Sequence, residues 1–119
     1  MNVISPLVQF QQQIRIFHWQ TDSYAEHKAF GKTYEELDSL IDEFIETFMG
    51  VFGRSKPTTT FQITLKPLSD RNVVDIVISD FVNYLDDLSS DIKNHTDLLN
   101  LRDSLRGEVN KLRYLLSLK

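Results

Sequence analysis

The sequence predicts an all-α protein: a four-helix bundle in which a long crossover joins the second helix to the third. Along four segments, apolar residues recur at spacings of three and four, which is the pattern of amphipathic helices. The chain has only four Gly and three Pro, and most of them lie between residues 50 and 67. A length of 119 residues suits one hydrophobic core. We therefore expect a single domain over residues 1–119.

The first two helices are predicted over residues 5–20 and 24–49. Ser5 before Pro6 is a typical helix start, because serine caps and proline is tolerated in the first turn. Ser23 and Glu26 form a capping box for the second helix, which should end near Gly50. The apolar stripes are Leu7, Phe10, Ile14 and Phe17, then Phe30, Tyr34, Leu37, Ile41, Phe44 and Phe48.

Residues 50–69 change character and predict an extended connection, since they contain Pro57, three threonines and an alternating apolar run that ends at Pro67. At ~3.3 Å per residue such a link reaches ~60 Å, more than the ~40 Å length of a helix of about 25 residues. It can therefore cross the whole bundle. Bundles with one long crossover include the ferritin-like fold, and we expect that arrangement.

The third and fourth helices are predicted over residues 70–93 and 96–117. Ser69 is the expected cap of the third helix, and the sequence Asn94-His95-Thr96 separates it from the fourth. The apolar stripes are Val74, Val77, Phe81, Leu85, Leu88 and Ile92, then Leu98, Leu101, Leu105, Val109, Leu112 and Leu116.

Composition excludes several function classes. The absence of Cys excludes disulfides, thiolate metal sites and cysteine nucleophiles. No apolar run approaches the ~18 residues of a membrane span, and the N-terminus does not read as a signal peptide, so we expect a cytoplasmic protein with no membrane partner. A net charge of −4 and the lack of any Lys or Arg before Arg15 argue against DNA binding.

Four ionisable residues on or beside the first two apolar stripes form the candidate site: His18, His27, Asp42 and Glu46. Imidazole and carboxylate together suit iron or zinc. A tight hairpin brings the two histidines to one end, but Asp42 lies 15 positions after His27, about 22 Å along the axis. A two-fold dimer of antiparallel hairpins would join the histidines of one chain to the carboxylates of the other. The spacing thus predicts an intersubunit metal site.

These residues resemble a known signature. His18-Trp19-Gln20, then His27, then Asp42 and Glu46 at the ends of an Asp-x-x-x-Glu run are similar to the ferroxidase motif of the Dps-type miniferritins. The resemblance covers about 45 residues and is weaker through the fourth helix. It implies that His18 and His27 of one subunit and Asp42 and Glu46 of its mate are metal ligands and catalytic residues, with Trp19 beside the metal. Some members place a further acid at the position of Gly31.

The resemblance also implies an activity: a ferroxidase that binds Fe²⁺, oxidises it to Fe³⁺ with hydrogen peroxide or dioxygen, and detoxifies or stores the iron. Zinc would be a substitute metal. The implied partner is a second copy in a homodimer with shared sites, and beyond it a dodecameric cage. Six acids between Glu35 and Glu46, with no Lys or Arg among them, would attract such cations.

Other interpretations stay open. The two histidines can be polar residues of a helix turn, and the two acids can be solvated surface. Trp19 is expected in the core or in a dimer interface. A non-enzymatic helical module that dimerises through the same hairpin, or a structural zinc site with the same ligands, would explain the pattern without any iron oxidation.

Overall fold

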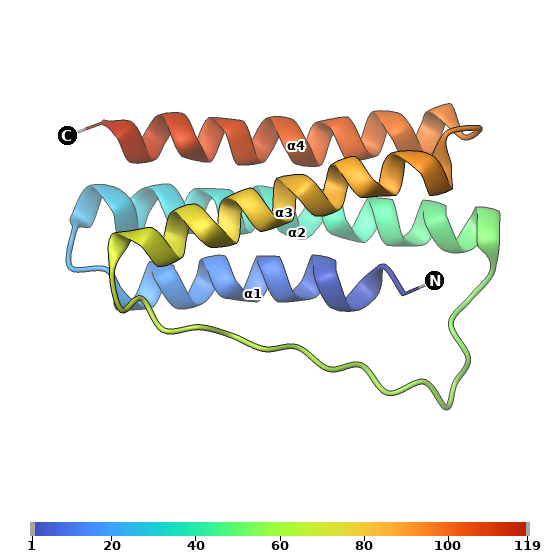
Figure 1. Cartoon of the computed structure of the whole chain (residues 1–119), viewed down its shortest axis with the longest axis horizontal. Helices are drawn as coiled ribbons and strands as arrows, with labels where there is room; N and C mark the ends of the chain where they lie inside the picture. The colour runs from blue at the N-terminus through green and yellow to red at the C-terminus, as the bar shows by residue number, and fades with distance from the viewer. Residues whose placement is uncertain (1, 119) are drawn as a thin grey trace.

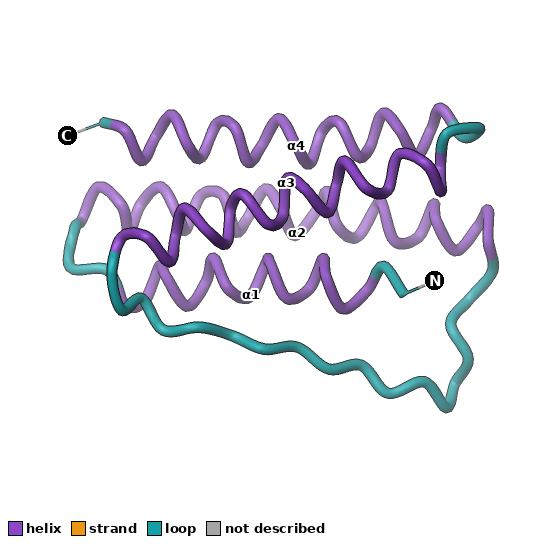
Figure 2. Tube along the Cα trace, in the orientation of Figure 1, coloured by secondary structure: helices purple, strands orange, loops and turns teal. Residues whose placement is uncertain are grey.

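The computed structural model describes residues 2–118, and within them it contains four helices and no strand. Both views show the helices side by side as a bundle, with a long connection along one side, which is teal in Figure 2 (Figures 1 and 2). The predicted all-α four-helix bundle is therefore confirmed. The helices are α1 (Ile4–Gln20), α2 (Tyr24–Phe52), α3 (Arg71–Ile92) and α4 (Thr96–Ser117).

Each helix packs against two neighbours. Contacts join α1 to α2, α2 to α4, α4 to α3 and α3 to α1, whereas the pairs α1/α4 and α2/α3 lie diagonally across the bundle. Two antiparallel hairpins, α1–α2 and α3–α4, result from short turns. The connection between them runs from the end of α2 back along the bundle to the start of α3, so α2 and α3 point the same way (Figure 1).

The core is formed largely by the predicted apolar stripes, and three of its phenylalanines are fully buried: Phe17, Phe30 and Phe44. Phe10 of α1 stacks face to face on Phe81 of α3, with ring centroids 3.8 Å apart. Burial of one such ring contributes roughly 1.5–3 kcal/mol relative to exposure. Among residues 2–118, no helix is apolar over a stretch long enough to cross a membrane.

Three helix ends differ from the sequence prediction. Helix α1 begins at Ile4 with Val3 as its cap residue, and the amide of Ser5 is bonded to Asn2 instead. Helix α2 continues past Gly50 to Phe52, because a glycine in a helix costs only ~1 kcal/mol and the chain first turns away at Gly53, where φ is +95°.

The third difference is the cap of α3, which is Asp70 and not Ser69. The Asp70 carboxylate accepts a hydrogen bond from the Val73 amide. A carboxylate at this position also interacts favourably with the helix dipole. The capping box of α2 is half formed: Ser23 accepts from the Glu26 amide, but the Glu26 carboxylate instead accepts from Thr21 and pairs with Arg71 at the start of α3.

A row of glutamines on α1 holds the connection in place. The Oε1 atoms of Gln9, Gln13 and Gln20 accept hydrogen bonds from the amides of residues 64, 66 and 68, and the Gln13 amide group also donates to the Lys66 carbonyl. Gln13 is buried for this reason, although glutamine is usually a surface residue. We call these three side chains the glutamine row.

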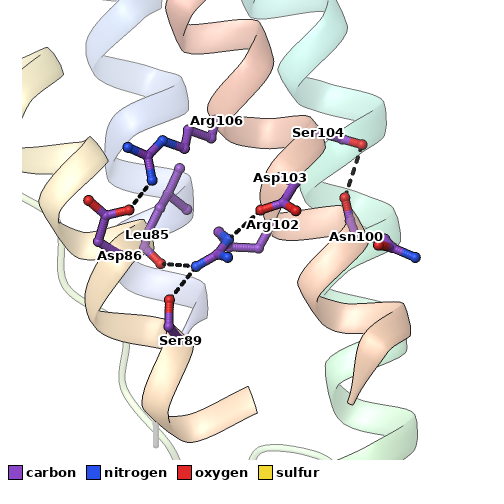
Figure 3. A network of polar contacts seen from close by, with 8 residues as sticks. All are labelled: Leu85, Asp86, Ser89, Asn100, Arg102, Asp103, Ser104 and Arg106. Carbon is purple, nitrogen blue, oxygen red and sulfur yellow. Dashed lines mark hydrogen bonds and ion pairs between the residues drawn. The ribbon is translucent and has the colours of Figure 1, made fainter. Parts of the chain in front are cut away.

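Helices α3 and α4 are joined by arginines (Figure 3). The Arg102 side chain is only 13% exposed, and its guanidinium donates to the Leu85 carbonyl, to Ser89 and to Asp103. Arg106, one turn further on, pairs with Asp86 at the surface. Arg102 and Arg106 are therefore both engaged with α3 of their own bundle.

Candidate metal centre

The two histidines of the candidate site meet at the α1–α2 turn. His18 lies in the last turn of α1 and His27 in the first turn of α2. Their rings stack nearly parallel, with centroids 3.9 Å apart and 15° between the planes. The sequence prediction that these residues are neighbours is confirmed.

Each histidine is fixed by the main chain of the other. His18 Nδ1 lies 2.7 Å from the His27 carbonyl oxygen, and His27 Nδ1 lies 2.8 Å from the His18 carbonyl oxygen. A carbonyl oxygen only accepts, so both Nδ1 atoms carry the proton. In neutral rings this leaves both Nε2 atoms with a free lone pair. Donation from one ring nitrogen to a carbonyl is the usual way in which metal-binding histidines are oriented.

Gly31 makes this arrangement possible. A Cβ atom added at this position would lie 2.9 Å from Cε1 of His18 and 3.0 Å from its Nδ1. The His18 ring thus packs directly on the backbone of α2, in space that any other residue would fill. Gly31 therefore serves the close approach of α1 to α2 at this point.

A cavity of about 260 Å³ opens beside the pair, lined by Arg15, His18, Trp19, Gly31, Tyr34 and Glu35. The Arg15 guanidinium lies between two aromatic rings, 4.9 Å from the centroid of Trp19 and 4.7 Å from that of Tyr34, and donates a hydrogen bond to the Tyr34 hydroxyl. Trp19 is 61% exposed, so the expectation that it lies in the core is wrong. Its place in a dimer interface stays a prediction.

Sequence reasoning missed Arg15 and Tyr34. His18 packs on Gly31, and Arg15 is one turn before His18 while Tyr34 is about one turn after Gly31, so the antiparallel hairpin sets Arg15 and Tyr34 side by side. The same register brings Gln11 to Asp38, and the Gln11 amide donates to that carboxylate at 2.9 Å.

The two carboxylates of the candidate site lie elsewhere. Asp42 and Glu46 are exposed on α2, several turns away from the histidines, as the spacing predicted. Within residues 2–118, no group of three or more His, Asp or Glu side chains is close enough to hold a metal ion. One protomer thus holds the two histidines and the two acids in separate places. Asp42 lies only about 60° around the helix from His27, so these two residues belong to one side of α2.

The chain matches the model of a family described as a family of unknown function, DUF5856, over residues 18–116. A relative from Enterobacteria phage T4 is described as an uncharacterized 14.6 kDa protein in the mobD-ri intergenic region. It is 28% identical over 102 residues, which cover 86% of this chain and 75% of that protein. No solved structure matches the chain significantly.

These findings correct the identification as a Dps-type miniferritin, because the matching family is a different one and the phage relative is not described as a ferritin. The resemblance rests on a few His, Asp and Glu positions in two helices, and helical spacing alone makes such patterns recur in acidic amphipathic helices. The family match extends over most of the chain instead. The chain therefore belongs to the DUF5856 family, whose function is unknown.

Proposed function

We propose that this protein binds ferrous iron between two copies of the chain and oxidises it. His18 and His27 of one copy and Asp42 and Glu46 of the other would be the ligands, in a homodimer formed through the outer side of the α1–α2 hairpin. The observation that carries the proposal is the reciprocal hydrogen bonding of the histidines, which fixes both rings and leaves both Nε2 atoms free to coordinate.

Two further observations support it. The acids of α2 from Glu35 to Glu46 are accompanied by no Lys or Arg, and a bound cation relieves the repulsion among them. The exposed Trp19 next to the histidines gives this side of the hairpin an aromatic anchor of the kind enriched in protein interfaces. We also assign the bundle to the ferritin-like arrangement on the basis of its long connection.

Ferrous iron is the substrate in this proposal. Each hydrogen peroxide molecule takes one electron from each of two Fe²⁺ ions, its O–O bond breaks, and two protons complete two water molecules. The protein would contribute ligands that hold Fe²⁺ with open positions for the oxidant. Dioxygen is the alternative oxidant in this proposal. Zinc is expected to compete with Fe²⁺ for the same ligands. The protein would encounter Fe²⁺ in the reducing cytoplasm.

The test is stopped-flow measurement of Fe²⁺ oxidation by peroxide, with metal content measured under anaerobic conditions. His27→Ala and Asp42→Ala should each reduce oxidation to the background rate. His95→Ala and Glu43→Ala are matched controls, since neither residue belongs to the candidate site, and both should keep the rate of the unaltered protein.

A mixing experiment tests directly whether the site is shared between two subunits. When His27→Ala and Asp42→Ala proteins are unfolded together and refolded, each mixed dimer regains one intact site and has one doubly damaged site. About half the dimers are mixed, so about a quarter of the original activity should return. Refolding either variant alone should restore none. A mixture as inactive as its components would contradict the shared site.

The second candidate is a non-enzymatic helical module that dimerises through the same hairpin. It is favoured by the exposure of Trp19 and Tyr24, at 61% and 74%, which needs no metal to explain it. Dimers that bind no iron or zinc and oxidise none would establish this function instead. Tight zinc binding without iron oxidation would identify a structural metal site.

A further inference from the structure

The connection between α2 and α3 has one occupied edge and one free edge. The amides of Thr64, Lys66 and Leu68 all point to the glutamine row of α1. In an extended chain, the N–H and C=O groups of successive residues alternate in direction. The groups of Ile63 and Leu65, and of Phe61 before them, must therefore point away from α1.

The free edge has the features of an unprotected edge strand. Within residues 2–118, the amides of Ile63 and Leu65 form no hydrogen bond, whereas those of Thr64 and Lys66 do. The side chains of Phe61, Ile63 and Leu65 are 41%, 40% and 38% exposed. Such an edge usually pairs with another strand unless charges, bulges or prolines block it. Residues 61–65 contain none of these.

The pattern is also symmetric about Ile63. Apolar residues with outward main-chain groups lie two positions before and two positions after it, and the residues between are the polar Gln62 and Thr64. We propose that residues 61–65 pair in antiparallel fashion with the same residues of a second copy. Ile63 would lie opposite Ile63 of the second copy, and Phe61 opposite Leu65 of the second copy.

A second copy fits this edge better than an unrelated strand. The two-fold axis at Ile63 lets every outward N–H and C=O group of the three apolar residues find a partner, without any further sequence requirement. It also puts their exposed side chains in cross-strand pairs on one face of the ribbon. No like charges meet, because residues 61–65 are uncharged and Lys66 would lie opposite Thr60 of the second copy.

This contact is separate from the dimer proposed above and does not depend on it. Two five-residue strands bury far less than the ~1,200 Å² typical of a stable interface, so the contact is expected to be weak by itself. Combined with the hairpin dimer, however, the strand contact would have a larger effect, because two different two-fold contacts on one chain build particles larger than a dimer. The strand contact would thus be an assembly surface for dimers formed through the α1–α2 hairpin.

Thiol cross-linking tests the register, because the chain contains no Cys. Opposed side chains in a strand pair have Cβ atoms about 5 Å apart, within reach of a short bis-methanethiosulfonate reagent. The Ile63→Cys protein should cross-link to itself. Phe61→Cys and Leu65→Cys should cross-link when mixed but not alone, because equal positions would then be about 13 Å apart. Thr58→Cys, exposed in the same connection, is the control for random collision.

Two results would overturn the proposal: Ile63→Cys cross-linking no faster than Thr58→Cys, or Phe61→Cys cross-linking to itself as well as to Leu65→Cys. Sedimentation gives an independent readout. Ile63→Lys puts two like charges on the two-fold axis and should reduce the largest particle to a smaller one while iron oxidation continues. His27→Ala should abolish oxidation and leave the Ile63→Cys cross-link intact, so the two proposals can fail separately.

Discussion

Replacing Gly31 by alanine tests whether close packing of His18 on α2 holds the histidine pair. In an unobstructed helix, Gly→Ala stabilises by about 0.5–1 kcal/mol. At Gly31, however, the new Cβ would lie 2.9 Å from the His18 ring, and the ring must move. It is held by a 2.7 Å hydrogen bond and by stacking on His27. These contacts contribute roughly 0.5–1.5 kcal/mol each. We therefore expect a net loss of about 1 kcal/mol.

Gly107 provides the matched control. It lies within α4, and a Cβ added there would meet nothing within 4 Å. Gly107→Ala should stabilise by about 0.5–1 kcal/mol. The two variants should then differ by about 2 kcal/mol, which is about 8 °C in Tm for a domain of this size. Urea denaturation and calorimetry of the metal-free proteins measure this difference.

A double-mutant cycle identifies the cause. In a His18→Ala background the obstructing ring is gone, so Gly31→Ala should become stabilising by about 0.5–1 kcal/mol, like Gly107→Ala. Equal stabilisation by Gly31→Ala and Gly107→Ala in the unaltered protein would refute the reasoning, because it would mean that the His18 ring moves at no cost.

Three further predictions concern other parts of the bundle. Arg102→Ala should lower the free energy of unfolding by about 1–3 kcal/mol, because it removes hydrogen bonds of a mostly buried guanidinium. Arg106→Ala breaks a surface ion pair and should lower the free energy of unfolding by less than about 1 kcal/mol. Urea denaturation of both variants measures the difference. Burial, then the charge of Asp91, raises the pKa of Tyr84 to about 12, so the folded state favours the protonated phenol, and stability should fall as the pH rises from 10 to 12. In Tyr84→Phe the loss over that range should be smaller, as monitored by circular dichroism. Gln13→Ala should accelerate hydrogen exchange of the Lys66 amide in mass spectrometry, with little change for Ile63, whose amide the glutamine row does not bind.

The helices could be predicted from sequence because burial repeats along them with the helical period. Every stripe residue of α1 is buried, and so are Phe30 and Phe44 of α2. Helix ends were predicted less accurately, because neighbouring residues can each act as the cap. Ser69 and Asp70 can both cap α3, and the carboxylate of Asp70 does so. Gly50 did not end α2, since a single glycine only weakens a helix.

The candidate site was predictable in part. Spacing alone brings His18 to His27 and keeps both away from Asp42, and the structure agrees on both points. The exchange of Nδ1 hydrogen bonds depends on the path of the turn, which spacing does not encode. The family assignment was wrong because the resemblance to miniferritins depended only on a few residues whose side chains suit metals. Trp19 was expected in the core or in a dimer interface because aromatic residues are usually buried, and its exposure excludes the core.

The glutamine row bonds main-chain atoms, so it recognises where the backbone lies and not which side chains it carries. The glutamine row excludes proline from positions 64, 66 and 68, whose amides it binds, but not from position 67, where Pro67 lies. The side chain of Gln62 can then vary without weakening the hydrogen bonds between the connection and α1. A foreign peptide could be grafted here in extended form with the bundle intact, but the strand contact proposed for residues 61–65 would be lost.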